Sequence, residues 1–363
     1  MRPVIVCSFL LVLGSSVFAN EFTQTNLVSN IPGMAITTDP NLADPWGMSF
    51  SATSPIWVSD RATGVSTLYS GAGAIVPLVV TVPPGAPVGP TGQVFAGGTA
   101  FMLNGSPADF IFATLAGTID AWNGTTTATV ERTTPGATFE GLALANNMLY
   151  ATNFQPGGGI DVFNSSYAPT TVVGGFVDPN LPAGFAPFNI QNIGGNLYVT
   201  YAKVTAGSPV PLPGGGGFVD VYDTNGNLIQ RLISSGSLDA PWGVALAPAS
   251  FDGFGGDLLV GNFGNGEINA FNPTTGAFLG TLDDSSGNPI VNSGLWAINF
   301  GNSSANPNAL YFNAGINGGT DGLFGDIQAS PEPASLAFTA VGVFALLGCA
   351  WMRRKSSAPR RDI

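Results

Sequence analysis

Pro45-Trp46-Gly47-Met48-Ser49-Phe50 and Pro241-Trp242-Gly243-Val244-Ala245-Leu246 are near copies of one pattern in this sequence of 363 residues. Weaker copies begin at Pro90, Phe139, Pro187 and Leu295. The third residues of the six copies are 47, 92, 141, 189, 243 and 297, so successive copies lie 45 to 54 residues apart. This spacing indicates a chain built from repeats of one supersecondary unit.

Each copy is followed by further strand-like segments. A short apolar run comes first, such as Ile56–Asp60 or Leu258–Asn262, and a run of alternating apolar and polar residues follows a glycine, as in Gly217–Asp223. Asn225-Gly226 then predicts a hairpin into a fourth strand, because both positions of that turn need positive φ. Four short strands in about 50 residues, six times over, predict an all-β, six-bladed β-propeller with four-stranded blades.

The two ends of the repeat region complete each other in this prediction. The sixth unit ends near Leu323–Ile327 with no room for its fourth strand, whereas Phe22–Ser29 is a strand-like segment without a unit. We expect Phe22–Ser29 to supply the missing strand and to close the ring, which removes exposed sheet edges. The high content of glycine (50) and proline (28) suits the turns of about 24 short strands.

Composition excludes several classes of function. The chain has no histidine, which removes Ser-His-Asp and Cys-His catalysis and His-ligated zinc. The net charge is −12, and residues 20–330 carry 20 acidic against four basic residues, a net −16. Because nucleic acid needs a basic surface, we expect no nucleic-acid partner. Both cysteines, Cys7 and Cys349, lie in the apolar end segments, so the part between them has no disulfide.

The N-terminus has the pattern of a secretory signal peptide. Arg2 precedes an apolar run from Val4 to Leu13, and small residues lead to a predicted cleavage site between Ala19 and Asn20. We therefore predict three regions: a signal peptide at 1–19, a propeller at 20–328 and a sorting or anchor segment at 329–363.

The C-terminal segment is a candidate membrane helix. Pro331, Glu332 and Pro333 precede 19 uncharged residues, 334–352, and Arg353, Arg354 and Lys355 follow. A helix of that length spans roughly 28 Å, enough for a bilayer core, and the basic tail predicts a cytoplasmic C-terminus. A plain single-span anchor would have the same hydrophobic and charge pattern.

Residues 329–363 also resemble the PEP-CTERM signal, in which a Pro-Glu-Pro tripeptide, an apolar helix and a short Arg-rich tail end the chain. The resemblance implies export in a Gram-negative bacterium and membrane retention through residues 334–352. It further implies processing by the protease exosortase and release or attachment at the cell surface. Proteins with this signal often accompany exopolysaccharide production. The implied partners are therefore exosortase, the secretion machinery, and exopolysaccharide or another surface protein.

The repeat region resembles the NHL-like, six-bladed propellers. The matching residues are the Pro-Trp-Gly pattern, Val58–Arg61 in the first unit and Val260–Gly266 in the fifth. The whole arrangement looks like a family of uncharacterised exported bacterial propellers with PEP-CTERM tails. That resemblance implies a fold and a destination, and no activity.

Trp46, Trp242 and Trp296 occupy the same position in three units, and we expect them near one end of the central channel. A ring of tryptophans there could stack on sugar rings. Alternatively, the three indoles fill the gaps between blades, the commoner use of buried aromatic residues and the interpretation we favour.

Five residues near strand ends are candidate calcium ligands, since calcium prefers oxygen donors. These are Glu140, Asn153, Asn189, Asn262 and Asn299. The propellers of the gluconolactonase class hold a channel calcium with such residues, but no local motif of that class is present here. Apart from calcium at this site, we expect no cofactor.

The sequence thus predicts an exported, surface- or matrix-associated propeller that binds a partner or glycan without catalysing a reaction. A calcium-dependent hydrolase of lactones or esters is the alternative. Pro209–Gly217, rich in proline and glycine, is predicted to be a mobile loop between strands.

Overall fold

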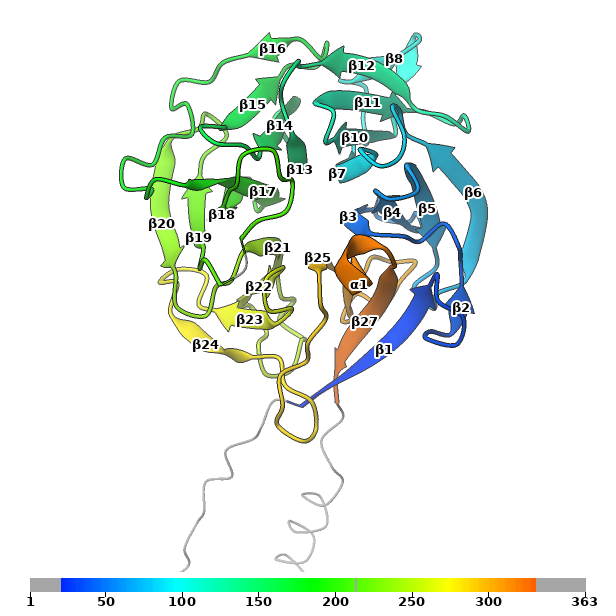
Figure 1. Cartoon of the computed structure of the whole chain (residues 1–363), viewed down its shortest axis with the longest axis vertical. Coiled ribbons are helices and arrows are strands. Elements are labelled where there is room, and N and C mark those ends of the chain that lie inside the picture. Colours follow the sequence, from blue (N-terminus) through cyan, green and yellow to red (C-terminus); the bar gives the residue numbers. More distant parts are fainter. Residues whose placement is uncertain (1–20, 213, 331–363) are drawn as a thin grey trace, which may run out of the picture. The chain divides into compact units, whose positions relative to one another are not determined.

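The computed structural model describes residues 21–212 and 214–330, which form six β-sheets arranged around one axis (Figure 1). Five sheets have four strands and the sixth has five, so the prediction of an all-β, six-bladed propeller is confirmed. The predicted signal peptide with its cleavage site, the Pro331–Pro333 motif, the apolar span 334–352 and the basic residues Arg353, Arg354 and Lys355 lie outside the described residues. In the described ranges, no helix is long and apolar enough to cross a membrane.

Each blade begins at the axis with the recurring pattern and moves outward strand by strand. The six innermost strands are β3 (Pro45–Ser49), β7 (Pro90–Phe95), β13 (Phe139–Ala145), β17 (Phe185–Ile193), β21 (Pro241–Leu246) and β25 (Leu295–Phe300). The second strands are β4 (Ile56–Asp60), β10 (Phe110–Thr114), β14 (Met148–Asn153), β18 (Asn196–Lys203), β22 (Leu258–Asn262) and β26 (Leu310–Ala314). The third strands are β5 (Val65–Tyr69), β11 (Thr118–Trp122), β15 (Ile160–Phe163), β19 (Phe218–Tyr222), β23 (Ile268–Phe271) and β27 (Leu323–Ala329).

The outer strands differ more in length. They are β6 (Ile75–Thr81), β12 (Thr129–Thr133), β16 (Pro169–Thr170), β20 (Leu228–Ser234), β24 (Phe278–Thr281) and, in the last blade, β1 (Phe22–Ser29). β1 pairs antiparallel with β27, from Phe22 opposite Ala329 to Ser29 opposite Leu323. The predicted ring closure by the N-terminal segment is therefore confirmed.

Elements beyond the repeat were not predicted. β2 (Thr37–Thr38) pairs in parallel with β1, and the small hairpin of β8 (Met102–Leu103) and β9 (Ser106–Pro107) interrupts the second blade. The short helix α1 (Ile316–Gly319) lies near the axis and connects β26 to β27 in the sixth blade (Figure 1).

Glycine lets the inner strands approach one another at the axis. A Cβ on Gly47 would overlap the backbone oxygen of Thr91 in the next blade, and one on Gly92 would overlap the backbone of Leu142. Hydrogen bonds join the blades at the same level: the Thr91 hydroxyl donates to the carbonyl of Phe139 at 2.8 Å, and the Asn189 amide donates to that of Trp242 at 2.7 Å. The recurring pattern thus joins the blades and leaves little free space along the axis.

Candidate functional site

One extra residue at the start of every inner strand sets the direction of the side chains beside it. Pro45 pairs with Asp60 and Met48 with Val58, so β3 has one more residue than β4 between these two pairs. The other five inner strands have a comparable shift in register near their start. Such bulges turn a side chain away from the regular alternation of a strand. The residues in this position, here called the axial ring, are Trp46, Thr91, Glu140, Phe188, Trp242 and Trp296.

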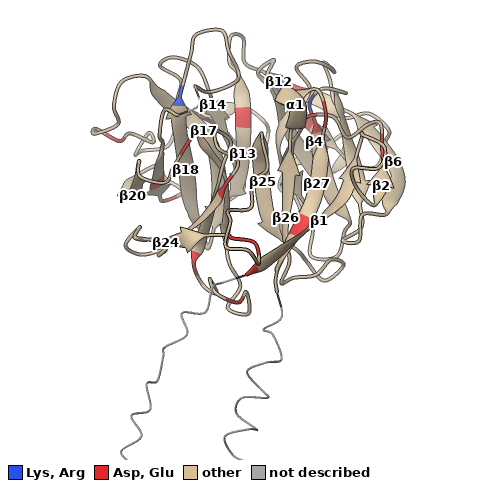
Figure 2. Cartoon of the chain, turned by 60° about the horizontal axis from the view of Figure 1, so that its bottom comes forward, with Lys and Arg blue, Asp and Glu red and all other residues tan. Residues whose placement is uncertain are grey.

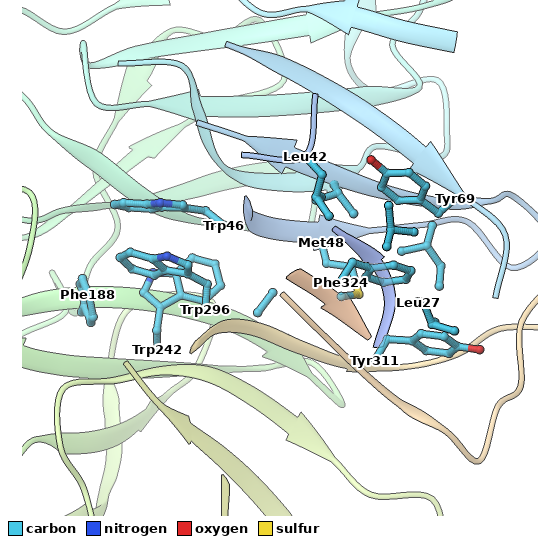
Figure 3. Packing of buried hydrophobic residues seen from close by; sticks show 14 of the residues in the cluster. Leu27, Leu42, Trp46, Met48, Tyr69, Phe188, Trp242, Trp296, Tyr311 and Phe324 are labelled. Atoms are coloured by element: carbon cyan, nitrogen blue, oxygen red, sulfur yellow. The ribbon is translucent and has the colours of Figure 1, made fainter. Parts of the chain in front are cut away.

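The aromatic members of the axial ring pack on one another (Figure 3). The rings of Trp46 and Trp296 are stacked with centroids 3.6 Å apart, and the ring of Trp242 meets Trp296 edge-on at 5.8 Å. Trp296 also contacts Phe188 at 5.7 Å and Phe263 at 4.4 Å. Each indole is at most 4% exposed. The three tryptophans therefore form one buried cluster across the blades.

A second set of equivalent positions lies where each second strand ends. There a backbone N–H donates to a carbonyl just before the inner strand of the same blade, as from Arg61 to Asp44 and from Phe263 to Ala240. The six residues in this position, here called the mouth ring, are Arg61, Leu115, Phe154, Val204, Phe263 and Gly315. Arg61 is the only charged member, so the first blade departs from the repeat.

Asp44 is the acidic partner of Arg61. Its φ is +48°, and Ala240, at the equivalent position of the fifth blade, has a φ of +49°. The Asp44 carboxylate accepts a hydrogen bond from Arg61 Nε, and Arg61 Nη1 donates to the carbonyl of Pro87 at 2.8 Å. A Cβ on Gly315 would overlap this carboxylate, so glycine is required beside it.

The indoles and the ion pair are in contact. The guanidinium carbon of Arg61 lies 5.6 Å from the centroid of the Trp46 ring, a cation–π distance. Burial raises the pKa of Asp44; the charge of Arg61 and the nearby indole N–H groups of Trp46 and Trp296 offset part of that rise. Neither indole N–H makes a hydrogen bond of normal geometry with the described residues.

A pocket of about 270 Å³, here called the mouth pocket, lies directly beside this cluster. Its charged and aromatic lining comes from Asp44, Arg61, Trp46, Trp296 and Phe263. The other lining residues, here called the rim, are Val210, Gly264, Ser293, Gly294, Gly315, Gly318 and Gly319. This volume lies just below the roughly 300–1,000 Å³ range of small-molecule sites.

The rim contains the loop predicted to be mobile. Val210 lies in that loop, and the backbone N–H of Gly214 donates to the Asp239 carboxylate at 2.6 Å. A Cβ on Gly264 would overlap the same carboxylate, so the backbone of Gly264 packs closely against it. The loop therefore reaches the mouth pocket at Val210, and a second acid, Asp239, lies behind the lining residue Gly264.

Glu140 is the acidic member of the axial ring. Its side chain is fully buried, and neither carboxyl oxygen has a hydrogen-bond partner among the described residues. Burial raises the pKa of Glu140 well above its ordinary value, and only the charge of Arg61 opposes that rise. A buried carboxyl without a partner is costly, so this one needs an explanation beyond packing.

Below the axial ring, the channel is narrow. The cavity there is about 20 Å³, room for about one water molecule. Asn189 and Asn299, two of the candidate calcium ligands, line this cavity. The other two asparagines bond to nearby turns: Asn153 accepts from the Thr138 N–H at 3.0 Å, and Asn262 donates to the Ser237 carbonyl at 2.8 Å.

The candidate calcium ligands thus divide between the axial ring, the channel cavity and the turns. In the described part of the chain, no group of three or more Asp, Glu or Cys side chains is placed to hold a metal ion.

Sequence analysis missed Asp44 and Arg61. Two signals could have found them. Asp44 replaces the alanine that precedes the near-identical Pro241-Trp242-Gly243, and Arg61 is one of only four basic residues in 20–330.

Comparison with known proteins gives relatives without an assigned activity. No family model matches the chain. It is 30% identical over 323 residues to uncharacterized protein R648 of Acanthamoeba polyphaga mimivirus, covering 83% of this chain and 78% of R648. It is 29% identical over 325 residues to uncharacterized protein L690 of the same virus, covering 83% of this chain and 84% of L690. The chain is a β-propeller, and it belongs to the family of R648.

Solved structures share the fold at low sequence identity. A protein of unknown function from Bacteroides thetaiotaomicron superposes with a TM-score of 0.54 at 12% identity, covering 85% of this chain and 77% of that one. A glucose dehydrogenase gives 0.53 at 13%, covering 85% and 100%. A streptogramin B lyase gives 0.51 at 13%, covering 85% and 97%. At this identity the likeness extends to the propeller fold alone.

Proposed function

We propose that this protein is an exported, surface- or matrix-associated propeller that binds a sugar unit of an exopolysaccharide in the mouth pocket and catalyses no reaction. The mouth pocket carries the proposal, because it is where charged residues break the six-fold repeat. The equivalent positions of the fifth blade hold Ala240 and Phe263, which maintain the fold there without charge. The Asp44–Arg61 pair is therefore not needed to build a blade.

The lining suits a polar ring of modest size. Aromatic side chains form one wall, the Arg61 side chain is 20% exposed, and glycines bring peptide groups to the rim. A sugar has both an apolar face and many hydroxyls, and it matches a surface of this kind. The tryptophans are too buried for broad stacking, so Arg61 and the rim make the polar contacts.

Export by the C-terminal signal belongs to this proposal. It is supported by the order of Pro331-Glu332-Pro333, the apolar span and the basic tail, whereas the relatives come from a virus. Fractionation of producing cells with and without exosortase tests it. We expect the protein outside the cytoplasm, with a processed C-terminus only when exosortase is present. A cytoplasmic protein would contradict export.

Binding is tested by affinity electrophoresis in a panel of neutral, acidic and amino polysaccharides. Ser293→Trp should fill the mouth pocket from its exposed rim and abolish any retardation. Val291→Trp, two residues away at a position 53% exposed and outside the lining, is the matched control and should bind like wild type. The binding proposal fails if no polysaccharide retards the wild type, or if Ser293→Trp changes nothing.

A calcium-dependent hydrolase of lactones or esters is the alternative from the sequence. Its five candidate ligands are distributed as described above, with Asn153 and Asn262 engaged in turns. The non-catalytic binding function therefore has the better support.

A further inference from the structure

The third blade has an outer strand too short to cover the strand beside it. β16 has two residues, whereas the outer strands of the other five blades have four to eight. The last residue that it pairs with β15 is Thr170, opposite Val162. Beyond Thr170 the chain leaves the sheet, and the N–H of Gly174 donates to the Asn225 carbonyl of the fourth blade at 2.8 Å. The start of β15 is therefore left without an outer neighbour (Figure 1).

Ile160 is the residue of β15 that lacks a partner. The Asn153 N–H donates to the Gly159 carbonyl at 2.9 Å, so the backbone of Gly159 faces β14 and, by alternation, that of Ile160 faces outward. The register of β16 would place Val172 opposite Ile160, but the pairing ends at Thr170. The N–H and the carbonyl of Ile160 thus have no ladder partner among the described residues. An unpaired edge of this kind is a template for another strand.

A pocket of about 320 Å³, here called the edge pocket, surrounds this unpaired stretch. Side chains of β15 point alternately to the two neighbouring blades, since Phe163 packs with the second and Val162 with the fourth. The edge pocket includes both sides. Its lining toward the second blade is Arg132, Thr134, Asp161 and Phe163, and its lining toward the fourth is Ile160, Val162, Val172 and Phe176. The edge pocket therefore lies where a longer β16 would continue.

Arg132 brings an unsatisfied charge to the edge pocket. Basic residues are few in the described part of the chain (Figure 2), and the other two arginines there, Arg61 and Arg231, form ion pairs with aspartates. Arg132 forms no ion pair with a described residue, and its Nε is buried without a hydrogen bond. The hydroxyl of Thr134 is also buried and unbonded. Both groups can donate to a carboxylate, the acceptor that arginine binds most strongly.

We propose that the edge pocket binds an extended peptide segment of a partner protein, which adds to β15 as an outer strand and places a carboxylate on Arg132. One peptide residue exchanges two backbone hydrogen bonds with Ile160 and packs its side chain on Val172 and Phe176. Its neighbour faces the second blade and meets Arg132. The recognised sequence is thus an apolar residue next to an acidic one. The edge pocket shares no lining residue with the mouth pocket, so this inference does not depend on sugar binding.

Selection of displayed random heptapeptides on the immobilised full chain tests the inference, followed by titration of the enriched peptides in solution. We expect an Asp or Glu next to an apolar residue, and its replacement by Asn or Gln should weaken binding at least about tenfold. N-methylation of the peptide residue that pairs with Ile160 should abolish binding, whereas N-methylation of the residues on either side should not. No enriched sequence, or affinity that N-methylation never changes, would overturn the proposal.

Variants of the chain test the proposed residues. Ile160→Pro removes the N–H offered to the peptide and should abolish binding; proline is tolerated on edge strands, and the melting temperature checks the fold. Arg132→Met should weaken binding at least about tenfold. Lys203→Met, at an exposed position outside the lining, controls for the loss of one positive charge and should bind like wild type. Full affinity in Arg132→Met would overturn the assignment of a carboxylate to that residue.

A second pair of variants tests the site without changing the backbone of β15. Thr171→Trp should fill the edge pocket from an exposed position and abolish binding. Val173→Trp, at a position 97% exposed and outside the lining, is the matched control. Ser293→Trp fills the mouth pocket and should leave peptide binding unchanged, which separates this inference from sugar binding.

Two results would contradict the account of the edge pocket. Peptide affinity in Thr171→Trp equal to that of the wild type would place the peptide elsewhere on the molecule. Sedimentation of the wild type as a dimer that Ile160→Pro dissociates would show that a second copy of the chain fills the edge pocket, and would overturn the assignment to a partner protein.

Discussion

The first and fifth blades begin with nearly the same residues and differ in what surrounds them. Asp44-Pro45-Trp46-Gly47 and Ala240-Pro241-Trp242-Gly243 both start from a residue with positive φ. The fifth blade has Phe263 where the first has Arg61, joined to the inner strand by the same backbone hydrogen bond. The repeated residues therefore build the blade, and the Asp44–Arg61 pair is an addition that the backbone does not require.

The largest expected effect comes from Trp296, which contacts Trp46 of the first blade and Trp242 of the fifth. Trp296→Ala removes ring contacts with Trp46, Trp242, Phe188 and Phe263 and should lower the free energy of unfolding by about 3–5 kcal/mol. Urea denaturation measures it. Trp242→Ala, which loses one of these ring contacts, should cost less. Equal losses of unfolding free energy in the two variants would show that Trp296 stabilises the cluster no more than Trp242 does.

The next effect tests why the pattern contains glycine. Gly47→Ala places a Cβ against the backbone of Thr91, and overpacking of this kind costs about 1–3 kcal/mol. Gly159→Ala is the control, because it lies in open space without a positive φ. Thermal melts of both variants compare them. A Gly47→Ala protein as stable as Gly159→Ala would remove the close approach of the blades as the reason for the pattern.

A smaller effect is expected when the first blade is converted to the fifth. Asp44→Ala alone leaves Arg61 without its partner and should cost about 1–2 kcal/mol, less than for a fully buried pair, since Arg61 is 20% exposed. In the double variant Asp44→Ala/Arg61→Phe, the aromatic ring replaces the guanidinium, as in the fifth blade, and most of this loss should be recovered. A double-mutant cycle by urea denaturation measures the coupling. Additive losses would show that the two positions act independently.

The pH dependence of stability sharpens the same comparison. Burial raises the pKa of Glu140, so the folded chain keeps this proton where the unfolded chain, with a pKa of about 4.3, has lost it. This contribution to stability is therefore complete at acid pH and is lost as the pH rises through the raised pKa. Glu140→Gln should flatten that part of a melting-temperature profile.

Asp284 provides a contrast of opposite sign. Backbone N–H groups of Asn288 and Ser286 lower its pKa, so its contribution is lost as the pH falls. Asp284→Asn should change only the acid end of the profile. If the melting temperature of Glu140→Gln varied with pH as that of the wild type does, the assignment of a raised pKa to Glu140 would be contradicted.

The smallest expected effect concerns calcium. If the mouth pocket binds sugars without a metal, the melting temperature should be the same in calcium and in chelator, because only a ligand of the folded state raises it. A clear rise with calcium would favour the hydrolase alternative.

The sequence predicted the fold well because the fold depends on local patterns. Phe22–Ser29 and Ile56–Asp60 were predicted with the bounds that the structure shows, since apolar runs between turn residues define a strand. The short outer strand β16 was not predicted. After Thr170 the chain turns toward the fourth blade, where Gly174 bonds to Asn225 and Phe176 packs on Tyr222.

The candidate site was predicted only in part. The three tryptophans share one position in the repeat, so their place near the axis followed from the spacing. Asp44 and Arg61 are 17 residues apart, and their pairing depends on the left-handed turn at Asp44 and on how β4 ends. Whether Glu140 has a hydrogen-bond partner depends on residues from several blades, so its lack of one can be seen only in the three-dimensional structure.

The most direct test is a binding titration of the Asp44→Ala/Arg61→Phe variant with the polysaccharide that retards the wild type most strongly. The central claim is that residues breaking the repeat at the mouth of the first blade form the binding site. We predict a folded protein with a melting temperature close to wild type and no measurable binding. Wild-type affinity in this variant would contradict the claim.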